Sequence, residues 1–214
     1  MQDKKNFYIN GQWVSPIEPR SFEVINPATE EPCAEISLGG KKDVDAAVTS
    51  AKKAFETWGF TTKEERLNLF EKLYDIYKKN WDQMAKTISL EMGAPIDFST
   101  ELQTKTGASH IKSFKNILKN FKFEKTLDEE KNQTILYEPK GVCALITPWN
   151  WPINQVNLKV IPALAAGCTV VLKPSEIAPL SSMLLAEMMH DAGFPKGVFN
   201  LINGDGAVTG DALT

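Results

Sequence analysis

The stretch that decides the fold is residues 141–176, "GVCALITPWNWPINQVNLKVIPALAAGCTVVLKPSE". It contains two short apolar runs, Val142–Ile146 and 168–172, and each is followed by a polar residue and a proline. Continuous apolar runs that end at turn residues are typical of strands buried on both faces of a parallel sheet. The residues between them, with a helix predicted over 153–166, suit a right-handed crossover.

The two predicted strands run into the polar segments "TPWN" (147–150) and "KPSE" (173–176). A helix that begins with Pro179 at its first position and a strand over 198–202 complete a β-α-β-α-β series, one half of a doubly wound sheet. In open α/β sheets, ligands bind beyond the carboxyl ends of the strands. We therefore expect both polar segments at one ligand-binding edge.

Asn150 stands between two tryptophans in "PWNWP". An amide held at a strand end can donate a hydrogen bond to a developing oxyanion, although the two prolines alone could explain this loop. Lys173 and Glu176 offer a donor and an acceptor for the hydroxyls of a ribose. A carboxylate there would repel a 2′-phosphate and favour NAD over NADP, whereas a lysine alone at a strand end is usually solvated.

The glycine-rich segment "GDGAVTG" (204–210) also follows a predicted strand. Its spacing is G-x-G-x-x-x-G, not the G-x-G-x-x-G of a dinucleotide fingerprint, and it follows the third strand instead of the first. A glycine-rich turn between a strand and a helix is the alternative interpretation.

The N-terminal part is predicted to be a β-hairpin followed by helices. Asn10-Gly11 predicts a hairpin over 7–14, and 22–25 predicts another strand. Helical spacing then predicts four helices with an apolar core face, beginning near Asp43 (as N-cap), Thr62 (with Glu65 in a capping box), Asn80 (as N-cap) and Asp97, the last running to about residue 121.

Residues 122–140 lose the helical period and predict two extended segments around a charged turn. A projecting hairpin with apolar residues such as Ile135 and Tyr137 suits strand addition to a partner chain. A surface hairpin on its own sheet fits this sequence equally well.

Composition narrows the class of protein. The chain has 214 residues, 43% hydrophobic and 24% charged, with 24 basic against 27 acidic residues. The sequence contains no stripe of basic residues, so a nucleic-acid partner is not predicted. The absence of a signal-like or membrane-length apolar run predicts a cytoplasmic protein without membrane contact. Three cysteines and two histidines show no metal-ligand spacing, so no metal site is predicted.

Five segments, "INGQWV", "VINPATEE", "ITPWNWP", "VVLKPSE" and "GFPKGVFNLINGDG", together resemble the NAD-dependent aldehyde dehydrogenase superfamily, in its order and spacing. The resemblance implies a Rossmann-like α/β fold with a partly parallel sheet and flanking helices, and it matches the N-terminal half only. It assigns 1–123 to the N-terminal part of a cofactor-binding domain, 124–140 to part of an oligomerisation arm, and 141–214 to the β-α-β-α-β half.

The resemblance also implies roles for single residues. Asn150 matches the catalytic asparagine whose amide stabilises the oxyanion of a thiohemiacetal. Positions that match the family's NAD-binding segments are Thr147, Pro148, Trp149, Asn150, Lys173, Pro174, Ser175, Glu176, Gly206 and Ala207. The family does not use the G-x-G-x-x-G fingerprint, which accounts for the spacing above. It implies an aldehyde substrate and a dimer or tetramer in the full-length form.

Family members are about twice as long, and the resemblance places three elements after Thr214: a pyrophosphate loop, a general-base glutamate and a nucleophilic cysteine. Cys33, Cys143 and Cys168 do not match the nucleophile by position. We therefore expect the isolated chain to lack the catalytic domain, to be inactive, and to aggregate or be partly disordered at the edge of its third parallel strand. Two alternatives are an inactive interaction module and a half-Rossmann nucleotide binder.

Overall fold

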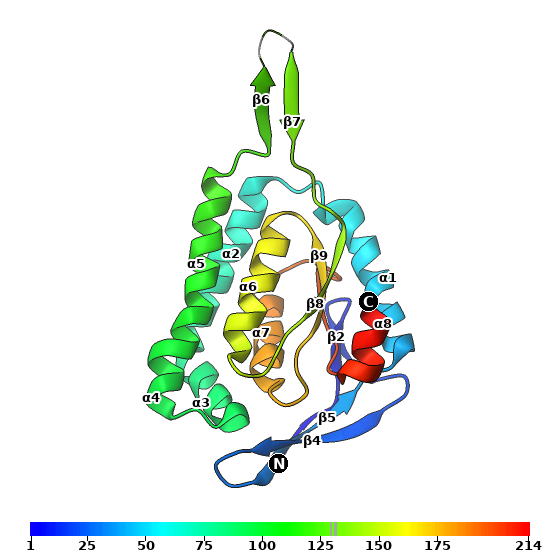
Figure 1. The fold of residues 1–214 in the computed structure, drawn as a ribbon, viewed down its shortest axis with the longest axis vertical. Helices are drawn as coiled ribbons and strands as arrows, with labels where there is room; N and C mark the ends of the chain where they lie inside the picture. Colours follow the sequence, from blue (N-terminus) through cyan, green and yellow to red (C-terminus); the bar gives the residue numbers. More distant parts are fainter. Residues whose placement is uncertain (129, 131) are drawn as a thin grey trace.

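The computed structural model describes residues 1–128, 130 and 132–214, so positions 129 and 131 of the predicted hairpin lie outside the described residues. The fold is mixed α/β with partly parallel sheets, which confirms the predicted class (Figure 1). The division into 1–123, 124–140 and 141–214 as domain parts stays a prediction.

A five-stranded sheet forms the centre of the molecule. Its strands, in spatial order, are β3 (Gln12–Val14), β2 (Phe7–Ile9), β10 (Phe199–Leu201), β9 (Thr169–Lys173) and β8 (Val142–Ile146). Strands β8, β9 and β10 are parallel and are joined through α6 (Pro152–Ala165) and α7 (Leu180–Asp191). The predicted β-α-β-α-β series is therefore present.

The sequence led us to expect an open edge at β10, but in the structure this edge is paired. The N-terminal hairpin pairs antiparallel with it, with Tyr8 opposite Leu201. The turn residues Asn10 and Gly11 have φ values of 53° and 73°, the left-handed pair that a tight hairpin needs. The hairpin is thus correctly predicted. The expectation of an exposed edge at β10 is wrong, because the hairpin pairs with that strand.

The two strands predicted to be buried on both faces differ. All five residues of β9 are buried, with Val171 packed on one face and Leu172 on the other. In contrast, β8 is only partly buried, and Ala144 and Ile146 are exposed. The reason is position, because β8 is the outermost strand and, within the described residues, pairs only with β9.

Helices cover both faces of the sheet. On one side lie α1 (Lys41–Trp58), the five-residue π-helix η2 (Gly206–Gly210) and α8 (Asp211–Leu213); on the other lie α6 and α7 with an outer layer of α2 (Lys63–Lys79), α3 (Trp81–Met92) and α5 (Lys105–Asn120). Figure 1 shows this arrangement. The predicted helix over 97–121 is divided into α4 (Ile96–Phe98), the π-helix η1 (Ser99–Thr104) and α5.

Helix ends follow capping chemistry, with two corrections. Thr62 and Glu65 form the predicted capping box. Asp43 is not the N-cap but the third residue of α1, where its carboxylate accepts from the Gly40 N–H at 3.0 Å. Asn80 is the N-cap residue of α3, as predicted, but its side chain makes no capping hydrogen bond there and donates instead to the Ile76 carbonyl at the end of α2. Pro179 precedes α7 as its N-cap residue.

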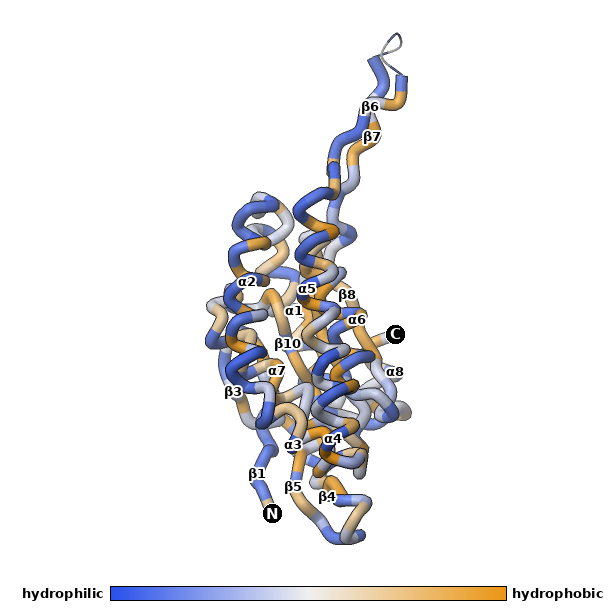
Figure 2. Tube along the Cα trace, turned by 90° about the vertical axis from the view of Figure 1, so that its left-hand side faces the viewer, coloured by the Kyte–Doolittle hydropathy of each residue, from blue (hydrophilic) through white to orange (hydrophobic). Residues whose placement is uncertain are grey.

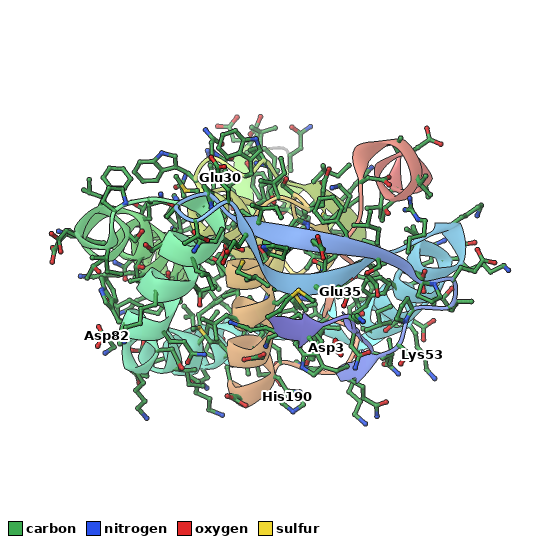
Figure 3. All side chains as sticks on the ribbon, turned by 90° about the horizontal axis from the view of Figure 1, so that it is seen from below. Asp3, Glu30, Glu35, Lys53, Asp82 and His190 are labelled. Atoms are coloured by element: carbon green, nitrogen blue, oxygen red, sulfur yellow. The ribbon has the colours of Figure 1, made fainter. Side chains whose placement is uncertain are left out.

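A second, three-stranded sheet lies at the lower end in Figure 1, with spatial order β1 (Gln2–Lys4), β5 (Glu31–Leu38) and β4 (Arg20–Asn26). Figure 3 views this sheet from below, with Asp3 and Glu35 labelled. The strand predicted over 22–25 is the middle of β4, whereas β1 and β5 are not predicted from the sequence.

Strands β6 (Glu124–Asp128) and β7 (Gln133–Leu136) form a separate two-stranded sheet, which projects away from the body in Figures 1 and 2. Leu127 and Leu136 are exposed on it. The predicted hairpin is present in its described residues, and its pairing with a partner stays a prediction. Within the described chain, no helix is long and apolar enough to cross a membrane.

Candidate functional site at the carboxyl ends of the parallel strands

Three predicted segments meet at one edge of the central sheet. Ile146 at the end of β8 pairs with Lys173 at the end of β9, and the Thr147 N–H donates to the Lys173 carbonyl at 3.2 Å. Leu201 of β10 pairs with Leu172 on the other side of β9. The segments 147–150, 173–176 and 203–207 therefore leave neighbouring strands in the same direction, as expected for a parallel sheet.

Lys173 lies at the centre of this edge with a side chain that is 4% exposed. Its Nζ donates to the carbonyl oxygens of Gly204 at 2.7 Å and Pro174 at 3.0 Å, and it lies 3.7 Å from a carboxylate oxygen of Glu176. Burial lowers the pKa of Lys173, while the charges of Glu176 and Asp205 oppose this change. The ammonium group is thus fixed in direction, and Glu176 is only partly buried beside it.

The loop after β8 presents a free amide. Pro148, Trp149 and Asn150 are exposed, and the Asn150 side chain makes no hydrogen bond to any described residue. Helix α6 begins at Pro152, so its N-terminus, which favours negative charge, directly follows this loop. The hydroxyl of Thr147 is buried and has no partner among the described residues. The loop can therefore donate hydrogen bonds to a ligand.

The turn after β10 approaches Lys173 closely. Asp205 is the N-cap of η2, and its Oδ1 accepts from the Val208 N–H at 2.8 Å. A Cβ at Gly204 would lie 1.9 Å from the Thr209 hydroxyl, whereas a Cβ at Gly206 would meet nothing within 4 Å. Gly206 and Ala207 are exposed. "GDGAVTG" is thus a glycine-rich turn into a short π-helix, which is the alternative interpretation given above.

Residues that the sequence did not suggest hold this turn. Arg20 of β4 donates to Asp205 Oδ2 at 2.7 Å and to the Gly39 carbonyl at 3.1 Å. The Thr209 hydroxyl donates to the same Gly39 carbonyl, and the Gly39 N–H donates to the Asn203 carbonyl at 2.8 Å. These partners are far apart along the chain, so no local pattern could have revealed them.

The cysteines do not supply a reactive thiolate to this edge. Cys33 lies on β5, Cys143 on β8, and Cys168 is buried just before β9. Burial raises the pKa of the Cys33 thiol, and burial together with Cys168 raises that of Cys143 to about 11. Within the described residues, no group of three His, Cys, Asp or Glu side chains could hold a metal ion.

The geometry fits a nucleotide. A fixed ammonium group next to a partly exposed carboxylate matches the hydroxyls of a ribose, which both donate and accept. The open space at Gly206 admits a flat group against the backbone. The buried Thr147 hydroxyl without a partner is a further polar atom at the same edge. All ten residues predicted to bind the cofactor belong to these three segments.

Known proteins are similar in sequence to this chain over all or nearly all of its length. The sequence profile described as "Aldehyde dehydrogenase family" matches residues 13–214. The 3-succinoylsemialdehyde-pyridine dehydrogenase of a Pseudomonas species is 50% identical over 214 residues, which are 100% of this chain and 44% of that protein. A putative aldehyde dehydrogenase of Staphylococcus aureus is 41% identical over the same shares.

Solved structures show the same similarity. The aldehyde dehydrogenase of Bartonella henselae superposes with a TM-score of 0.97 at 57% identity, over 100% of this chain and 45% of that one. An aldehyde dehydrogenase C mutant from Pseudomonas syringae, solved with NAD+ and octanal, gives 0.94 at 46% identity, over 97% of this chain and 42% of that one. The present chain thus spans less than half the length of these relatives.

Proposed function

Because this chain belongs to the aldehyde dehydrogenase family, we propose that it is the N-terminal, cofactor-binding part of an NAD-dependent enzyme that oxidises an aldehyde to a carboxylic acid. The observation that carries the proposal is that the loop bearing Asn150 and the segment bearing Lys173 and Glu176 leave neighbouring parallel strands at their carboxyl ends. Relatives of this fold bind NAD+ in their solved structures, and one of them also holds octanal.

We assign to Asn150 the role of stabilising the oxyanion that forms during the reaction. In the complete enzyme, a cysteine thiolate supplied by residues other than these 214 attacks the aldehyde carbon. The carbonyl oxygen becomes negative, and the free Asn150 amide donates a hydrogen bond to it. The N-terminus of α6 adds positive potential next to the same loop. A preorganised donor of this kind stabilises the transition state more than the ground state.

We assign the cofactor to the same edge. NAD bound at this edge would supply the hydride acceptor for oxidation of the aldehyde. Lys173 and Glu176 would hold the ribose, with the ammonium group as donor and the carboxylate as acceptor for its hydroxyls. Because a 2′-phosphate would face the Glu176 carboxylate, NAD is favoured over NADP. The remaining contacts are assigned to Thr147, Pro148, Trp149, Pro174, Ser175, Gly206 and Ala207.

The wider setting follows from the same family membership. We propose a cytoplasmic homo-oligomer in which the β6–β7 hairpin contacts a second subunit, with no nucleic acid and no membrane as partner. The relatives are named for or solved with different aldehydes, a pyridine-bearing semialdehyde and octanal. We therefore assign no particular aldehyde to this chain.

The test is aldehyde-dependent NADH formation, followed at 340 nm with a panel of aldehydes. The complete enzyme that carries these residues should turn over, and the purified 214-residue chain should not, since loss of a nucleophile costs on the order of a million-fold in turnover. Family-like rates from the 214 residues alone would overturn the assignment of the nucleophile. Submicromolar NAD binding by the same chain, measured by calorimetry, would instead favour a self-sufficient nucleotide-binding module.

A further inference from the structure

We propose that the ion pair between Arg20 and Asp205 is a positioning device for the cofactor site: it holds the 203–210 turn in place and, through the Gly204 carbonyl, fixes the direction of Lys173. This deepens the proposed function and rests on it. Neither residue is assigned to contact the substrate or the reacting atoms.

The contacts form one continuous path. The Arg20 guanidinium donates to Asp205 Oδ2 at 2.7 Å with one nitrogen and to the Gly39 carbonyl at 3.1 Å with the other. Asp205 uses its second oxygen to cap η2. One residue before Asp205, the Gly204 carbonyl accepts from Lys173 Nζ at 2.7 Å. The fork of Arg20 therefore joins β4, the β5–α1 loop and the turn that orients Lys173.

The turn requires such a support because of its composition. Asp205 stands between Gly204 and Gly206, the residue type with the greatest backbone freedom. Gly39 is held closely, since a Cβ there would lie 2.6 Å from Ile202 Cγ2. Arg20 and Thr209 both donate to the carbonyl of this tightly packed residue, so the glycine-containing turn is anchored to a closely packed position.

The pair also adjusts the local charge. Lys173 faces two carboxylates, Glu176 at 3.7 Å and Asp205 at longer range. Arg20 neutralises Asp205, so the field at the ribose position depends on both partners of the pair. Loss of the Asp205 charge would make this field more positive, and loss of the Arg20 charge would make it more negative. A 2′-phosphate would report this difference because it carries the additional charge of NADP.

The experiment compares Arg20→Met and Asp205→Asn in the complete enzyme, with Lys4→Met as the matched control. Asn keeps an acceptor for the Val208 N–H, so this variant tests the ion pair more than the cap. Lys4 forms an ion pair of similar exposure with Glu187 at 3.1 Å, on α7. Both test variants should raise the KM for NAD roughly tenfold, the size expected for one charge-assisted hydrogen bond. Both test variants should keep the kcat at saturating NAD and the KM for the aldehyde. The control should keep all three kinetic constants of the unmodified enzyme.

Two further measurements separate positioning from general stability. Arg20→Lys keeps the charge but not the two-nitrogen fork, so it should restore part of the NAD affinity. The ratio of NADP to NAD activity should rise for Asp205→Asn and fall for Arg20→Met, whereas a purely structural defect would move both in one direction. An NAD KM equal to that of the control in both variants, or a loss of kcat with unchanged NAD KM, would overturn the proposal. Absence of activity in the unmodified enzyme would refute the proposed function instead.

Discussion

Lys173 Nζ lies 2.7 Å from the carbonyl oxygen of Gly204, and this hydrogen bond joins the end of β9 to the turn that follows β10. Lys173 ends one strand and Gly204 follows the parallel strand next to it, so the bond closes the edge at which the cofactor is proposed to sit. Because Gly204 also packs against Thr209, the space on its other side is already occupied. The position of the lysine therefore depends on a glycine that accepts no side chain.

A first prediction follows for Gly204→Ala. The added methyl would overlap the Thr209 hydroxyl, so the turn must shift and Lys173 loses one of its two carbonyl acceptors. We expect a loss of about 1–3 kcal/mol in unfolding free energy, measured by urea denaturation, together with weaker NAD binding. Gly206→Ala is the matched control for stability alone, because nothing lies within 4 Å of its added Cβ. Equal unfolding free energies of the two variants would contradict this view of the turn.

Asn150→Ala should separate catalysis from stability. The side chain is exposed and has no partner among the described residues, so its removal should leave the melting temperature unchanged. Loss of one oxyanion donor should lower kcat of the complete enzyme roughly 100- to 1,000-fold. The measurement is steady-state NADH formation at saturating NAD and aldehyde. A kcat within a few-fold of the unmodified enzyme would remove Asn150 from the mechanism.

How far the sequence predicts this site depends on the distance between partners. The segments 147–150 and 173–176 follow local apolar runs, so periodicity alone places them at one sheet edge. Strand β5 was not predicted although Ala34 and Ile36 alternate inward along it, because it begins with Glu31 and Pro32, two residue types that are depleted in strands. Arg20 and Asp205 lie 185 residues apart, and only the folded chain shows that they meet.

Glu91 is predicted to make stability depend on pH. It is fully buried in α3 and accepts hydrogen bonds from the backbone N–H groups of Leu180 and Ser181 at the start of α7. Burial raises its pKa to about 7, and these hydrogen bonds only partly oppose the effect. Since the folded pKa exceeds the unfolded one, the folded protein binds the proton more tightly. The contribution of Glu91 to stability should therefore be largest below about pH 4.5 and fall as the pH rises to 7.

The measurement is the unfolding free energy from pH 4 to 8 for the unmodified chain and for Glu91→Gln. The unmodified chain should lose roughly 3 kcal/mol across this range through Glu91, and the uncharged glutamine should not. The difference between the two curves isolates Glu91, because every other titrating group is common to both proteins. Parallel curves would show that Glu91 keeps an ordinary pKa in the folded state.

Asn200 is predicted to keep the N-terminal hairpin on the edge of β10. Its Oδ1 accepts from the Asn10 N–H at 3.0 Å, and its Nδ2 donates to the carbonyls of Val170 at 3.2 Å and Gly197 at 2.8 Å. Asn200 is fully buried, so Asn200→Ala removes three hydrogen bonds to backbone groups, each contributing about 0.5–1.5 kcal/mol.

We expect this variant to be destabilised by several kcal/mol and to loosen β2 from β10. The exposed edge of β10 would then be free to pair with other chains, since an open strand edge promotes aggregation. Light scattering during mild heating should show earlier aggregation for Asn200→Ala than for Asn116→Ala, a substitution on the exposed face of α5. Hydrogen exchange should locate the change, with faster exchange in residues 7–14 and 199–201 while β8 keeps its rate. Unchanged exchange in the hairpin would show that its strand pairing, and not Asn200, holds it to the sheet.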